Sequence, residues 1–421
     1  MAVISIGKSD VELAELAHLG SDNIQVADKL CAFLVAISPI LQHYVGVYEN
    51  AGFSVLIIAI LILSIKAFTT FNIKISAECL RAIFPLILFE LYTVMDRSFS
   101  ISRALYAVFF IWLYICIAMG VFNVKYFLKY ATAIISLATV LLIVQYFSHY
   151  VLHYTINLRP FSLLVDQNSI WIKHSLQAYI PGRMYRPAAF FLEPSHLFVY
   201  SFPVLCLLLL APGMTRWRMT RALIVTFALL LSTSGMGIVI SMGIWGVYFL
   251  YYKDKNDKNQ KSSASRIQKM LLTALVFLII VIVAYATVPI FQKSINRIFL
   301  NTNGTNAIDG RIRLAKKYIT TITGNAIIFG APNVTSQIEF NLAGFFATYI
   351  KWGIIGLLLT YWFYIQGLFK LKNAYFWISA IIVVISFFTA HTHGTFYMMY
   401  YIVFLMNGYY ETELKKRRTN Q

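Results

Sequence analysis

Residues 186–212 read RPAAFFLEPSHLFVYSFPVLCLLLLAP, and this stretch combines the features that decide the fold and the candidate site of the chain. From residue 194 onward the stretch is apolar and close to the ~20 residues that a helix needs to cross a bilayer. Ahead of it, Arg186 and Glu193 stand seven residues apart. A cation and a carboxylate held where lipid meets water suit chemistry on a charged amphiphile, such as a diphosphate on a lipid tail.

The composition of the whole chain places it in the membrane class. Hydrophobic residues make up 59% of the chain and charged residues 12%, whereas soluble domains carry about 25% charged residues. The mean hydropathy is +0.70. The cysteines all lie in apolar runs, so we expect neither a disulfide framework nor a zinc site. They are Cys31, Cys79, Cys116 and Cys206.

The hydropathy pattern predicts an all-α fold, a polytopic integral membrane protein with about twelve transmembrane helices. The expected spans in the first half are residues 30–48, 53–70, 78–95, 102–122, 127–151 and 194–212. Those in the second half are residues 220–233, 235–252, 270–291, 343–369, 374–390 and 395–410. Residues 220–252 are too long for one crossing of a ~30 Å core, so the Ser-Thr-Ser-Gly break at 232–235 predicts a tight hairpin.

The distribution of basic residues predicts the orientation. If both termini are cytoplasmic, most of the 35 lysines and arginines fall in inner loops, in keeping with the positive-inside rule. We then expect a cytoplasmic amphipathic segment at 1–29, a single transmembrane domain at 30–412 and a basic cytoplasmic tail at 413–421. Two long outer loops are expected, at 152–193 and 292–342.

These two outer loops carry more cations than anions. The cations are Arg159, Lys173, Arg183, Arg186, Lys293, Arg297, Arg311, Arg313, Lys316 and Lys317, and the anions are Asp166, Glu193, Asp309 and Glu339. Positive charge on the translocated side works against the predicted orientation, so anion binding is its natural use. The alternative is that long loops translocate regardless of charge and that the lysines are merely solvated.

The second outer loop contains a stretch with helical periodicity at 308–322. One stripe of this stretch is apolar, and it consists of Ile312, Ala315, Ile319 and Ile322. Arg313 and Lys317 lie one turn apart on a shared face, and Arg311 lies in the first turn. Such a helix can aim guanidinium groups at phosphate oxygens, although a surface helix without a ligand explains the pattern equally well.

Histidines and one intramembrane carboxylate complete the candidate set. His391 and His393 form the turn between the last two spans, where a neutral imidazole can accept a hydroxyl proton or simply bond to the backbone. Glu90 lies inside the third span, so it faces a cavity, extends to the interface, or pairs with Arg97 or Arg103.

Several motifs are absent from the sequence. The chain has no Walker loop and no Rossmann glycine fingerprint, which argues against nucleotide-driven pumping. No Asp-x-Asp motif lies in an outer loop, which argues against a metal-held sugar nucleotide as donor. We therefore expect no cofactor, no metal ion and no nucleic-acid partner. A donor without nucleotide or metal suggests a sugar activated on a lipid diphosphate, with arginines neutralising the leaving group.

Residues 186–195, RPAAFFLEPS, resemble the Arg…Phe-x-Glu-Pro-Ser signature of the bacterial O-antigen polymerase (Wzy-type) family. Residues 231–235, LSTSG, resemble the Ser-x-Ser-Gly hairpin of that family. Gly310-Arg311 and the later Phe329-Gly330 are similar to its second arginine loop, and Arg313 with Gly324 matches an Arg-x10-Gly spacing. The first outer loop lacks that spacing. The resemblance covers residues 183–393, and the related O-antigen ligases share the architecture.

The resemblance implies a metal-independent glycosyltransferase with a GT-C-like architecture. Its donor is a growing glycan on undecaprenyl diphosphate, and its acceptor is the hydroxyl of a new lipid-linked repeat unit. Arg186 and Arg311, supported by Arg313, would bind the diphosphate and stabilise the leaving charge. Glu193 or His393 would orient or deprotonate the acceptor hydroxyl, unless Glu193 is only the structural partner of Arg186. The further residues expected to bind the substrate are Arg159, Arg183 and Lys317.

The resemblance also implies where the protein lies and what it meets. We expect a multi-pass protein of the bacterial inner membrane with its active site facing the periplasm. Membrane lipids and a regulator of chain length from the same pathway are further expected partners. Two alternatives remain: an O-antigen ligase that transfers polymer to lipid A-core, and a glycolipid flippase. A flippase needs a cation-lined central cavity, whereas the arginines of this chain lie in outer loops.

Overall fold

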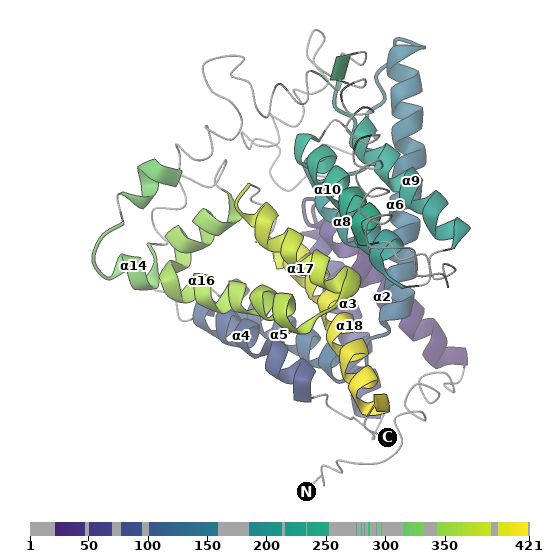
Figure 1. The fold of residues 1–421 in the computed structure, drawn as a ribbon. Helices are drawn as coiled ribbons and strands as arrows, with labels where there is room; N and C mark the ends of the chain where they lie inside the picture. Colours follow the sequence, from purple (N-terminus) through teal and green to yellow (C-terminus); the bar gives the residue numbers. More distant parts are fainter. Residues whose placement is uncertain are drawn as a thin grey trace, which may run out of the picture.

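The computed structural model describes residues 22–46, 50–69, 77–94, 101–158, 185–212, 215–232, 234–251, 315–320, 322–331, 343–388 and 395–419, together with a few single positions from 275 to 296. Within these residues every regular element is helical, and one isolated β-bridge joins Val45 and Asn50. The all-α prediction is confirmed for this part of the chain (Figure 1). Residues 1–21 of the amphipathic segment expected at 1–29 lie outside the described residues.

Twelve helices are described, and most of them coincide with an expected span. They are α2 (Asp22–Leu41), α3 (Ala51–Thr69), α4 (Ala77–Val94), α5 (Ile101–Ala118), α6 (Val124–Tyr150), α8 (Pro194–Leu210), α9 (Arg216–Leu231), α10 (Gly235–Tyr251), α14 (Ala326–Phe329), α16 (Gly344–Lys370), α17 (Asn373–Ser386) and α18 (Thr395–Thr419). Several helix boundaries differ from the prediction, and the following three extend helix into segments expected to lie outside the membrane. Helix α2 begins inside the segment expected at 1–29, helix α18 runs into the expected tail, and Gln292 and Asn296 are helical inside the expected second loop. Hydropathy marks the apolar part of a helix, whereas backbone hydrogen bonding continues into polar turns.

Among the described residues, three helices are long and apolar enough to cross a membrane, namely α3, α6 and α16. Each has large apolar side chains that are more than half exposed, for example Leu61, Val140 and Leu358. Exposed apolar side chains on long apolar helices suit contact with lipid. The composition of the chain and these three helices are therefore those of a membrane protein.

Helices α8 and α18 occupy the centre of the bundle. Nearly every residue of α8 is buried, and α18 packs against α2, α4, α5, α6, α8, α16 and α17. Figure 1 shows α18 in yellow passing among the other helices toward the end where the C-terminus lies. These two helices form the scaffold from which the other elements are positioned.

Prolines lie inside three of the described helices, α2, α4 and α8, and in α2 and α8 a polar side chain replaces the missing backbone donor. Pro203 in α8 has no N–H, so the Val199 carbonyl four residues earlier loses its usual helical donor. The Tyr401 hydroxyl on α18 donates a hydrogen bond of 3.1 Å to that carbonyl. Pro39 frees the Val35 carbonyl in the same way within α2, and there the Ser38 hydroxyl donates at 3.0 Å. Polar side chains thus replace the backbone donors that proline removes, as a membrane interior requires.

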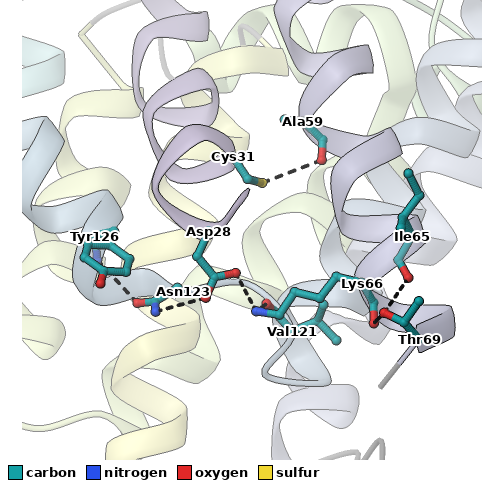
Figure 2. Close-up of polar contacts among 9 residues, drawn as sticks. All are labelled: Asp28, Cys31, Ala59, Ile65, Lys66, Thr69, Val121, Asn123 and Tyr126. Atoms are coloured by element: carbon teal, nitrogen blue, oxygen red, sulfur yellow. Dashed lines mark hydrogen bonds and ion pairs between the residues drawn. The ribbon is translucent and has the colours of Figure 1, made fainter. Parts of the chain in front are cut away.

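The beginning of α2 and the end of α3 are joined by a polar network (Figure 2). Lys66 Nζ lies 2.6 Å from the Asp28 carboxylate and donates to the Val121 carbonyl at 2.8 Å. Asn123 donates to the other Asp28 oxygen at 3.4 Å, and its own side-chain oxygen accepts from the Tyr126 amide to cap α6. Lys66 therefore serves as a structural link between three chain segments.

Helix α16 is broken near its middle, which the expected single span at 343–369 did not include. Gly353 has φ 64° and ψ −162°, so the chain changes direction there, and Figure 1 shows the resulting bend. A Cβ on Gly353 would meet the Ile328 carbonyl oxygen at 2.2 Å, and one on Gly330 would meet the Lys351 carbonyl oxygen at 2.2 Å. The backbone before α16 thus packs directly into the break. The Tyr92 hydroxyl donates a hydrogen bond to a backbone carbonyl on each of these two segments.

Glu90 is buried among helices rather than exposed to lipid, with 6% of its surface accessible. It lies within electrostatic range of the fully buried Tyr114 hydroxyl of α5. This burial argues against the expected alternative in which Glu90 extends to the interface. The two predicted arginine partners of Glu90 fall outside the described side chains.

Candidate functional site

The segment 185–193, which precedes α8, is held against the end of α6. The Tyr185 ring stacks on His149 with their centroids 4.0 Å apart, and it meets two further tyrosines of α6 edge-on. The buried Gln145 side chain accepts a hydrogen bond from the Ala189 amide at 3.0 Å and donates to the Ile156 carbonyl at 3.2 Å. One glutamine therefore fixes the backbone at two places, in the chain that leaves α6 and in the segment that leads into α8.

The two residues that the sequence singled out lie at the edges of this segment. Arg186 and Glu193 are both partly exposed, whereas Ala188, Phe191 and Leu192 between them are buried. The Nε atom of Arg186 is inaccessible to solvent. Apolar anchoring of the intervening residues limits how far either charged side chain can move, because buried side chains occupy single rotamers.

Glu193 begins α8, as the sequence predicted for the boundary of this span. Its backbone is extended, with φ −139° and ψ 156°, and Pro194 follows at the first helical position. Its carboxylate accepts a hydrogen bond from the Ser195 hydroxyl at 2.9 Å. The start of a helix is a favourable place for negative charge because the N–H groups of the first turn point toward it. Glu193 is thus positioned by the helix that it begins.

Two histidines join this site from different parts of the chain, and sequence reasoning missed them. His43, in the turn after α2, stacks on His196 of α8 with ring centroids 4.9 Å apart and an interplanar angle of 26°. The Tyr397 ring of α18 packs against the His196 imidazole, with ring centroids 5.8 Å apart and an interplanar angle of 68°. His196 is therefore enclosed between His43 and Tyr397, with 1% of its surface exposed. The sequence placed His43 at the expected outer end of the first span, which is the same side of the membrane as Glu193. It did not show that α2 and α8 are neighbours, because no local pattern reports which helices pack together.

The predicted break at 232–235 is confirmed as a turn between α9 and α10. The Ser232 hydroxyl donates to the Leu229 carbonyl at 2.8 Å and ends α9. The Ser234 hydroxyl oxygen accepts from the Gly237 amide at 3.3 Å and caps α10. A Cβ on Gly237 would lie 3.3 Å from the Phe198 Cβ, so the start of α10 lies beside the start of α8.

These contacts define one end of the bundle, which we call the α8-start end. It consists of the end of α2, the end of α6, the segment 185–193 and the starts of α8, α10 and α18. At the other end of α8, the Arg218 guanidinium donates to the Leu207, Leu208, Ala211 and Pro212 carbonyls. This arginine serves as a helix cap, because the last carbonyls of a helix lack backbone donors.

The second expected loop contributes a separate apolar cluster. Ala315 and Ile322 are buried against Ile350, and Ile319 packs beside them, which confirms three members of the predicted apolar stripe. The fourth member lies outside the described residues. Lys317 is exposed, with its Nζ atom 5.8 Å from the Tyr318 ring centroid. The helical piece that bears Lys317 thus rests on the first half of α16 and not on segment 185–193.

The remaining predicted site residues lie outside the described residues. These are Arg159, Arg183, Arg311, Arg313 and His393. Of the predicted set, the structure therefore places Arg186 and Glu193 on one anchored segment, and it adds the two histidines to their neighbourhood. Among the described residues, no three histidine, cysteine, aspartate or glutamate side chains are grouped closely enough to hold a metal ion.

No protein-family model matches the chain, and no curated protein matches it.

Proposed function

We propose that this protein polymerises lipid-linked oligosaccharide repeat units of O-antigen or a related surface polysaccharide. It would act on the periplasmic side of the bacterial inner membrane as a metal-independent glycosyltransferase with a polyprenyl-diphosphate-linked donor. The observation that carries the proposal is the placement of Arg186 and Glu193. Both are partly exposed on one anchored segment at the start of a central helix.

The proposed chemistry needs one cation and one proton acceptor near the anomeric carbon. The acceptor hydroxyl attacks that carbon while its bond to the lipid diphosphate breaks. Arg186, together with Arg311 and Arg313, would neutralise the charge that develops on the diphosphate, because guanidinium groups bind phosphate oxygens in bidentate fashion. Glu193 would orient or deprotonate the hydroxyl. A purely structural role for Glu193 as the partner of Arg186 stays open.

The surroundings of the segment support a positioning role. A reaction between two bound molecules gains most from groups whose geometry is set before binding. Gln145 and the aromatic packing of Tyr185 set the backbone of the segment, and the buried α8 sets the direction of Glu193. Arg311 and Arg313 from the second loop would complete the anion site.

The proposed topology has about twelve spans, with both termini cytoplasmic and the loops at 152–193 and 292–342 periplasmic. Its support is that the ends of α2 and α6 meet the starts of α8 and α10 at one end of the bundle. Helices that alternate in direction across a membrane bring alternate ends together in this way.

The experiment is a gel of surface polysaccharide from a strain that lacks the gene and expresses the wild-type or a variant protein. Wild-type protein should restore the ladder of chain lengths. Arg186→Ala should leave single-repeat units, and Arg221→Ala, a change of an exposed arginine near the far end of α8, should behave as wild type. Full-length polymer from Arg186→Ala would refute the assignment of Arg186.

The same gel distinguishes the ligase alternative. In a ligase deletion, polymer would accumulate on the lipid carrier and none would reach lipid A-core. In a polymerase deletion, one repeat unit would still be transferred to the core. Loss of every repeat from the core would therefore replace the polymerase proposal by the ligase.

A further inference from the structure

The His43–His196 pair lies at the same end of the bundle as Glu193, and three helices build it. The turn after α2 contributes His43, α8 contributes His196, and α18 contributes Tyr397, whose hydroxyl also donates to the His196 carbonyl at 3.5 Å. The Tyr200 hydroxyl of α8 donates to the Ala36 carbonyl of α2 at 2.8 Å. The two helices are therefore tied one turn below the stacked rings, which makes the pair a fixed feature of the fold.

Two stacked imidazoles behave as a pair in acid–base chemistry. Protonation of one ring disfavours protonation of the other, since two like charges would then lie 4.9 Å apart. Histidine is also the side chain whose ordinary pKa lies closest to neutrality. With at most one ring protonated, the pair retains one neutral imidazole. Among the described residues of these helix ends, Tyr44, Glu193 and Tyr397 are also titratable.

The relation between His196 and Glu193 gives the pair a counter-charge. Glu193 is the N-cap of α8 and His196 follows three residues later, and the His196 amide donates to the Glu193 carbonyl at 3.0 Å. Side chains at the N-cap and three residues on share one side of the first helical turn. A positive charge that arises on the imidazole pair is thus formed one turn from a carboxylate.

We propose that the His43–His196 pair takes up the proton released by the acceptor hydroxyl, an inference that rests on the proposed polymerase function. The hydroxyl O–H bond breaks as its oxygen bonds to the anomeric carbon of the donor sugar. The bond from that carbon to the diphosphate breaks, and its electron pair leaves on the diphosphate. The proton passes to His43, the partly exposed ring of the pair, and Glu193 offsets the resulting positive charge.

Two substitutions of His43 separate proton uptake from packing. His43→Phe keeps an aromatic ring on His196 but cannot accept a proton, whereas His43→Asn keeps a polar group but loses the stack. The polysaccharide gel is read in the deletion strain, with the amount of each variant measured in isolated membranes. His153→Asn, a change of an exposed histidine in the chain after α6, is the matched control.

If the pair takes up the proton, both His43 variants lose long chains, about 100-fold or more by the usual contribution of a general base, while His153→Asn keeps the ladder. If His43→Phe restores the wild-type ladder, the pair is a packing contact and the inference is wrong. The two variants perturb packing differently, so either one that accumulates normally decides the question. Failure of the wild-type protein to restore any ladder would instead overturn the proposed polymerase function. Loss of the ladder in His393→Asn, with His43→Phe active, would assign the proton to His393.

Discussion

The hydrogen bond from Tyr401 to the Val199 carbonyl should stabilise the protein only because Pro203 is present. Tyr401 is fully buried, and its hydroxyl donates to a carbonyl that Pro203 deprives of its helical donor. Tyr401→Phe keeps the ring and removes only the hydroxyl. A buried acceptor without a donor costs about 1–3 kcal/mol in soluble proteins, and hydrogen bonds between membrane helices reach about 1.7 kcal/mol. We expect Tyr401→Phe to lower the free energy of unfolding by about 1.5 kcal/mol.

The matched control is Tyr400→Phe on the same helix. The Tyr400 hydroxyl donates to the Tyr200 carbonyl at 2.9 Å, but Val204 supplies a backbone N–H at the helical position four residues later. That carbonyl therefore keeps a donor when the hydroxyl is removed. We expect a cost of about 0.5 kcal/mol for Tyr400→Phe, close to the average for hydrogen bonds between membrane helices.

The assay is equilibrium unfolding in mixed detergent micelles, followed by tryptophan fluorescence. Pro203→Ala restores an N–H for the Val199 carbonyl, so Tyr401→Phe should cost only about 0.5 kcal/mol in that background, as Tyr400→Phe does. The double-mutant cycle should give a coupling of about 1 kcal/mol between positions 203 and 401. An equal cost of Tyr401→Phe in both backgrounds would refute the reasoning.

Three further predictions concern stability; the first two use the same unfolding assay and the third uses size-exclusion chromatography. Arg218→Ala should lower the free energy of unfolding by about 2 kcal/mol, because the guanidinium satisfies the carbonyls at the end of α8; an unchanged value would show that water replaces it. Lys66→Met should cost about 2 kcal/mol, and adding Asp28→Asn should recover part of that loss, since removal of one partner leaves a partly buried charge unpaired; strictly additive costs would contradict this. Gly353→Ala should abolish the monodisperse peak in size-exclusion chromatography, because the added Cβ would lie 2.2 Å from the Ile328 carbonyl oxygen and because φ is positive. Gly246→Ala in α10 should be neutral, since nothing lies within 4 Å of its added methyl group.

Local sequence signals predicted most helix positions. The starts of α8 and α10 were predicted within a residue, because Pro194 and Ser234 act through short-range capping that depends on immediate neighbours. The break in α16 was not predicted. Gly353 reads as one more glycine in an apolar run, and only the approach of the Ile328 backbone from a distant segment requires its positive φ. A helix break imposed by a tertiary contact leaves no local signal.

The amino-acid sequence by itself determined the membrane class, the helical fold and the segment with Arg186 and Glu193. Composition and hydropathy are local sums, so each of these follows from residues close together in the chain. Only the tertiary structure decided that His43 stacks on His196, that Tyr401 serves the carbonyl freed by Pro203, and that Gln145 holds the segment before α8. Each of these contacts joins separate helices, and helix–helix packing depends on which apolar faces are complementary across the whole bundle.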